Sequence, residues 1–88
     1  MPIVSQFYGI LITMYFNENT KHHLPHLHAE YAEYDAVFDF KGNIIDGEIP
    51  NKQRKMIEAW ISIHEEELNS LWKTMQIHNE FFKINPLQ

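Results

Sequence analysis

The spacing of apolar residues changes once along this chain, near Pro50, and that change limits the folds open to it. Before Pro50 apolar and polar residues alternate, as on a half-buried strand. After it, apolar-face positions recur every three or four residues, as on one side of a helix. These positions are Met56, Ile57, Trp60, Ile61, His64, Leu68, Leu71, Trp72 and Met75. The pattern predicts an α+β domain with a β-rich part (residues 1–50), a helical part (51–78) and a docked tail (79–88).

The first part of the chain is expected to form an antiparallel sheet of three to four strands. The expected strands are Ile10–Phe16, His26–Glu33, Tyr34–Phe40 and Ile44–Ile49. Gly47 is expected to mark a bulge in the last strand. One long amphipathic helix should follow, with Asn51 as its N-cap and a kink near residues 62–68, and it should cover one sheet face.

Size and composition narrow the class of protein. At 88 residues the chain forms a single domain, and the lack of cysteine excludes disulfides and thiolate metal sites, which fits a cytoplasmic protein. The net charge of −5 and the few, scattered lysines and arginines make nucleic acid a disfavoured partner. The apolar run from Phe7 to Phe16 is too short for a membrane-spanning helix, so no membrane association is expected.

Four of the six histidines fall within seven residues, at positions 22, 23, 26 and 28. On a strand, His26, His28 and Glu30 share one face, with neighbouring members about 6.5–7 Å apart at the backbone. Two imidazoles at this spacing can converge on one metal ion, with His22, His23 or His64 as a third ligand. Without cysteine the ligands are nitrogen and oxygen, which leaves zinc, nickel, copper and iron as candidate divalent transition metals.

Two other interpretations of the histidines stay open. His26 and His28, with Glu30 and a nearby tyrosine, could transfer protons at neutral pH and act on a phosphodiester, as small ribonucleases do. Alternatively, the histidines are structural, and the chain is a non-enzymatic protein-binding module or a homodimer. The sequence alone therefore does not decide whether this protein is an enzyme.

Several blocks of the sequence resemble the small prokaryotic domain of unknown function 4160 family. They include Pro25-His26-Leu27-His28-Ala29-Glu30-Tyr31, Gly47-Glu48-Ile49-Pro50, Ala59-Trp60, Ile63-His64, Glu67-Leu68 and Trp72. The resemblance implies a compact bacterial protein in a two-gene, toxin–antitoxin-like system, with a protein partner encoded nearby and a ribonuclease-like activity. The family motif contains His26, His28 and His64. These three are the predicted metal ligands, and His26, His28 and Glu30 are the predicted catalytic residues.

Overall fold

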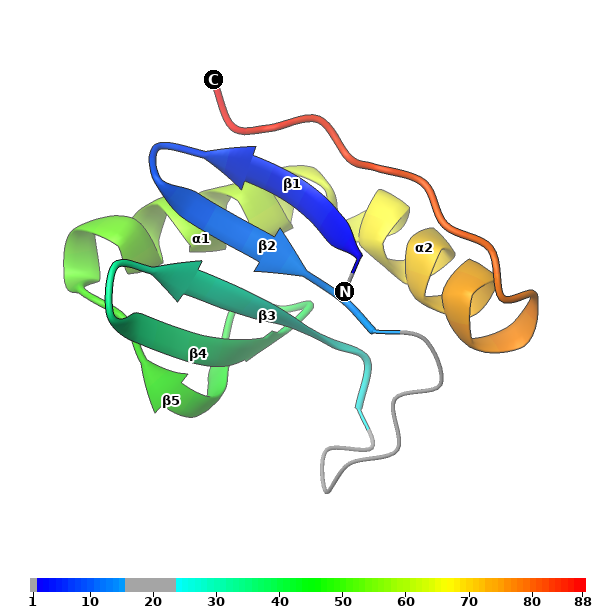
Figure 1. The fold of residues 1–88 in the computed structure, drawn as a ribbon, viewed down its shortest axis with the longest axis horizontal. Coiled ribbons are helices and arrows are strands. Elements are labelled where there is room, and N and C mark those ends of the chain that lie inside the picture. Colours follow the sequence, from blue (N-terminus) through cyan, green and yellow to red (C-terminus); the bar gives the residue numbers. More distant parts are fainter. Residues whose placement is uncertain (1, 16–23) are drawn as a thin grey trace.

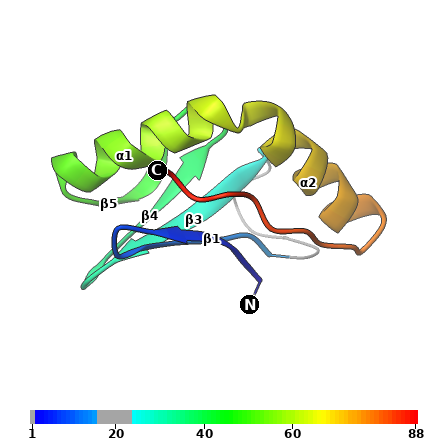
Figure 2. The ribbon, with the colours of Figure 1, turned by 90° about the horizontal axis from the view of Figure 1, so that it is seen from above.

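The computed structural model describes residues 2–15 and 24–88 and shows one antiparallel sheet with two helices over one of its faces (Figures 1 and 2). The strands are β1 (Ile3–Phe7), β2 (Ile10–Thr13), β3 (His26–Tyr31), β4 (Tyr34–Asp39) and β5 (Ile44–Glu48). The helices are α1 (Asn51–Ile63) and α2 (Glu65–Ile77). The strands lie in the sheet in chain order, so each pairs with its sequence neighbour. The predicted α+β class and antiparallel sheet are confirmed.

The predicted strand count was wrong, because the described residues form five strands. The strand that was not predicted is β1, which ends at Phe7 and is separated from β2 by a tight turn at Tyr8 and Gly9 with φ angles of 48° and 79°. Positive φ at both central residues is the geometry of a two-residue hairpin turn. The predicted first strand is β2, which begins at Ile10 as expected but ends at Thr13. Its expected last residue, Phe16, lies outside the described residues.

The remaining hairpins follow the prediction more closely. β3 ends at Tyr31 rather than at Glu33, because a turn with Ala32 at φ 52° separates it from β4. In β5 the register with β4 shifts between Ile44 and Asp46, so the bulge lies at Ile45 and not at Gly47, where it was expected. Gly47 itself has φ +79°, and a Cβ there would lie 2.4 Å from the carbonyl oxygen of Asp35.

The helical part is two helices and not the single long helix that was predicted. His64, with φ −110° and ψ 23°, separates them, within the range where a kink was expected. The residues that follow are Glu65, Glu66 and Glu67, and carboxylates favour a helix N-terminus because they complement its dipole. The predicted cap was also wrong: Pro50 is the N-cap of α1, and Asn51 is its first helical residue.

The core lies between the sheet and the two helices, and the C-terminal tail closes one side of it. Leu27, Ala29, Trp60 and Leu71 are among its fully buried residues. The tail runs along β1 (Figure 1). There the Ile84 N–H donates to the carbonyl of Val4 at 3.0 Å, and the Trp60 indole N–H donates to the carbonyl of Asn85 at 2.8 Å.

Candidate functional site

The two strand histidines of the predicted site lie together at the start of β3. Leu27 and Ala29 alternate with them and are fully buried in the core, so the pleat places His26 and His28 together on one side of the strand. The centroids of the two imidazole rings are 5.3 Å apart, at an interplanar angle of 67°. The co-facing pair predicted from strand alternation is therefore present.

These imidazoles are the middle of a row of five rings, which we call the histidine–aromatic row. Tyr15, just after β2, meets His28 edge-on at a centroid distance of 4.7 Å. On the other side, Trp72 of α2 lies 5.3 Å from His26, and Phe40 lies 6.2 Å from Trp72. Trp72 was predicted to be part of the apolar helical face, but its packing on a histidine was not predicted. The row links the ends of β2, β3 and β4 to α2.

Burial separates the roles that the two imidazoles can take. His26 is 1% exposed, and its Nδ1 lies 2.7 Å from the carbonyl oxygen of Leu24. Since a carbonyl only accepts hydrogen bonds, Nδ1 is the donor in this contact. His28 is only partly buried. A substrate can thus reach His28 more readily than His26.

α2 holds the row at two points. Trp72 packs on His26, and one turn later the Gln76 side-chain amide donates to the carbonyl oxygen of Tyr15 at 2.9 Å. The main chain of Tyr15 and the ring of His26 are both fixed to the same helix. The spacing of the row therefore depends on how α2 docks.

The other predicted site residues lie apart from this contact. Glu30 is exposed and lies two residues after His28 on β3, where it pairs in register with Leu11 of β2 and Asp35 of β4. His64 packs on Trp60, with ring centroids 5.4 Å apart, and its Nδ1 pairs with the Glu67 carboxylate.

Of the three predicted metal ligands, the structure brings His26 and His28 together and places His64 elsewhere. Within residues 2–15 and 24–88, no group of three or more histidine, aspartate or glutamate side chains is placed to hold one metal ion. A site completed by His22 or His23 lies outside the described residues.

Beside the segment that leads into β3, the structure has a pocket of about 260 Å³ that the sequence did not indicate; we call it the β3-entry pocket. The segment leading into β3, the β4–β5 turn and the first turns of α2 form its walls. The lining residues are Leu24, Pro25, Asp39, Phe40, Lys41, Glu65 and Asn69.

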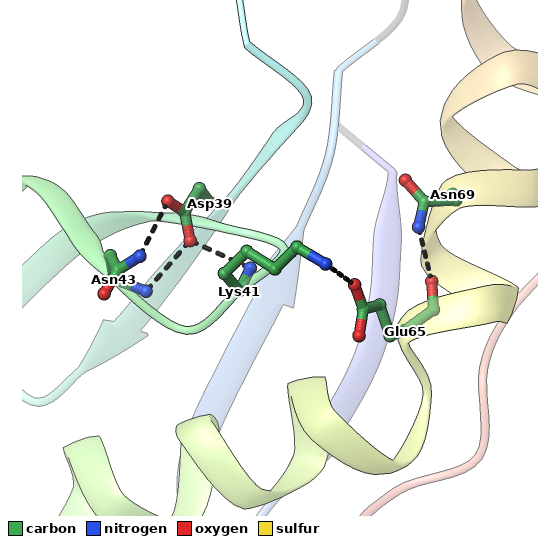
Figure 3. A network of polar contacts seen from close by, with 5 residues as sticks. All are labelled: Asp39, Lys41, Asn43, Glu65 and Asn69. Carbon is green, nitrogen blue, oxygen red and sulfur yellow. Dashed lines mark hydrogen bonds and ion pairs between the residues drawn. The ribbon is translucent and has the colours of Figure 1, made fainter.

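The polar residues of the pocket form a network (Figure 3). The Lys41 ammonium pairs with the Glu65 carboxylate across 24 positions of sequence, and this contact raises the pKa of Lys41. The Asn69 side-chain amide donates to the Glu65 carbonyl at 3.1 Å. The ion pair joins the β4–β5 turn to α2, the helix that also holds the row.

Asp39 organises the turn itself. Its carboxylate accepts hydrogen bonds at 2.9 Å from the main-chain N–H groups of Lys41 and Asn43. Partial burial alone would raise the pKa of Asp39, but hydrogen bonds from Asn43, Lys41 and Gly42 together outweigh it and lower the pKa. Asp39 is therefore ionised at neutral pH and has its oxygens committed to the turn.

Comparison with known proteins places this architecture in a family. The model of the domain of unknown function DUF4160 matches residues 9–73, more than half of the chain. The protein belongs to this family. The resemblance inferred from the sequence blocks is confirmed. Comparisons with curated proteins and with solved structures found no match.

The DUF4160 match covers both features described above. It spans the histidine–aromatic row, from Tyr15 to Trp72, and the whole β3-entry pocket. β1 and the C-terminal tail lie outside the matched range. In the described part of the chain no helix is long and apolar enough to cross a membrane.

Proposed function

We propose that this DUF4160 protein is the ribonuclease-like component of a cytoplasmic, two-gene, toxin–antitoxin-like pair, and that His28 is its acid–base residue. The observation that supports this most is the row itself, in which His28 lies between a second imidazole and a phenol. Histidine titrates near neutral pH, so a positioned imidazole can transfer protons under physiological conditions.

Each member of the row has a role in this proposal. His28, the more accessible imidazole, accepts the proton of an attacking ribose hydroxyl group. Tyr15, edge-on to His28, donates a proton to the leaving oxygen. Buried His26 positions the ring of His28. Glu30 lies two residues further along the same strand, is exposed to solvent, and assists proton transfer by His28.

A defined RNA tests the proposal, with cleavage by the untagged protein measured in the absence of its neighbouring gene product. His28→Gln should slow cleavage by about 100-fold or more, the usual contribution of a general acid or base. The matched control is His78→Gln, since His78 is exposed at the end of α2 and should leave the rate unchanged. No cleavage by the wild type, together with no growth arrest on expression, would refute the proposal.

The metal form of the proposal uses the same pair of imidazoles. Here His26 and His28 bind a divalent transition metal such as zinc, with His22 or His23 as the third ligand. Metal analysis of the untagged protein distinguishes the two forms. Stoichiometric metal that is lost in the His26→Ala/His28→Ala variant supports the metal site. Substoichiometric metal that is unchanged in this variant excludes it.

A second candidate function is a non-enzymatic module that binds another protein or forms a homodimer. It is favoured by apolar side chains that are more than half exposed: Leu24 at 57%, Ile63 at 66% and Ile77 at 70%. Co-expression with the neighbouring gene product, followed by size-exclusion chromatography with light scattering, tests this function. A monomer that elutes separately from that product would exclude it.

A further inference from the structure

The β3-entry pocket combines an apolar surface with a charged side. Pro25 and Phe40 provide apolar surface, and Leu24 extends it onto the exterior, where its side chain is 57% exposed. The volume of about 260 Å³ is below the range of roughly 300–1,000 Å³ typical of small-molecule sites. A pocket of this size suits a single large side chain better than a cofactor.

The charged side of the pocket is formed by the ion pair between Lys41 and Glu65, in which another cation can replace Lys41. The Lys41 and Glu65 side chains are 75% and 37% exposed, and ion pairs in such positions add little to stability. Lys41 is the only cation among the described residues that line the pocket, against the carboxylates of Asp39 and Glu65. With Asp39 committed to the turn, Glu65 is the carboxylate that a cationic ligand can take over.

We propose that the β3-entry pocket binds one apolar side chain of a partner protein, and that an arginine or lysine beside that side chain replaces Lys41 on Glu65. The charge of the pocket and the net charge of −5 both favour a basic partner segment. Large aromatic side chains are the usual anchors in pockets of this kind. This interaction is independent of the chemistry proposed for His28.

Titration of the isotope-labelled full chain with defined peptides tests this binding by NMR. The peptide Gly-Arg-Trp-Arg-Gly should cause saturable shifts of the backbone amides of Phe40, Lys41 and Asn69. The controls Gly-Glu-Trp-Glu-Gly and Gly-Arg-Gly-Arg-Gly should bind at least about tenfold more weakly, because each lacks one of the two recognised features. Equal binding of all three peptides, or shifts confined to another surface, would overturn the proposal.

Substitution of the two members of the ion pair should change the affinity for the basic peptide in opposite directions. Glu65→Gln should weaken binding of the basic peptide roughly fivefold, whereas Lys41→Gln should tighten it by removing the competing ammonium. Glu66→Gln, an equal charge change on the neighbouring exposed residue outside this pocket, should have no effect.

Three outcomes of these titrations contradict the assignment. Reversed signs for Glu65→Gln and Lys41→Gln would show that the pocket takes an acidic segment. Equal weakening by Glu65→Gln and Glu66→Gln would show diffuse charge attraction. Shifts of the pocket amides with chain concentration alone, without peptide, would show that the occupant is a second copy of this chain.

Discussion

Replacement of Gly47 by alanine tests how closely β4 and β5 approach each other. A Cβ at Gly47 would lie 2.4 Å from the carbonyl oxygen of Asp35 and 2.9 Å from the Cα of Ala36. Both are backbone atoms, so no side-chain rotation can relieve the contact. Gly47 also has φ +79°, a conformation that residues with a Cβ rarely adopt.

Gly42 provides the matched control, because it shares the unusual backbone and lacks the close contact. Its φ is +90°, and the nearest atom to a Cβ there is the Glu58 Cγ at 3.7 Å. The backbone conformation should cost each alanine variant about 1–2 kcal/mol. Forcing the strands apart should cost Gly47→Ala roughly a further 1–3 kcal/mol.

Urea unfolding followed by circular dichroism measures both variants. We expect the free energy of unfolding to fall in the order wild type, Gly42→Ala, Gly47→Ala. If the two variants agree within about 0.5 kcal/mol, the close approach of Gly47 to β4 is refuted, since differences of that size are within the usual error of additivity.

Three further predictions concern single side chains. Thr13 is fully buried and its hydroxyl has no hydrogen-bond partner among the described residues, so Thr13→Val should raise the free energy of unfolding by about 1 kcal/mol in urea titrations. Thr13→Ser, which keeps the hydroxyl and loses a methyl group, should lower it. The pKa of Asp39 is lowered below its ordinary value of 3.8. The contribution of Asp39 to the free energy of unfolding is therefore present above about pH 4 and is lost as the pH falls through the lowered pKa. Asp39→Asn should therefore lose less stability than the wild type between pH 5 and 2, and parallel acid-unfolding curves would contradict this. Asn79 has φ 56° just after α2, so Asn79→Gly should raise the melting temperature and Asn79→Ala should lower it.

The elements that local pattern determines were predictable from sequence. The change of period near Pro50 correctly predicted a sheet followed by helices, and strand alternation correctly paired His26 with His28. The break at His64 falls where a kink was expected. In each case the controlling interactions are between residues a few positions apart.

What could not be predicted depends on unusual backbone or on distant contacts. The turn between β1 and β2 places Tyr8 at φ 48°, and an aromatic residue gives no signal for that conformation. The β3-entry pocket exists only because α2 docks against the β4–β5 turn and brings Glu65 to Lys41. The packing of Trp72 on His26 likewise follows from the direction of α2 after the break. Periodicity predicts that a side chain is buried but does not identify its neighbours.

The two outer strands of the sheet are protected in different ways, with a consequence for solubility. β5 carries a bulge and the exposed charges of Asp46 and Glu48, features that discourage a strand from another molecule. β1 (Ile3–Phe7) has no charged side chain, and instead its edge is covered by the tail, where the Ile84 N–H donates to the carbonyl of Val4. An unprotected strand edge is a template for aggregation. The C-terminal tail, which lies outside the family match, covers this edge, so a change that releases the tail should expose β1 and increase aggregation of the protein.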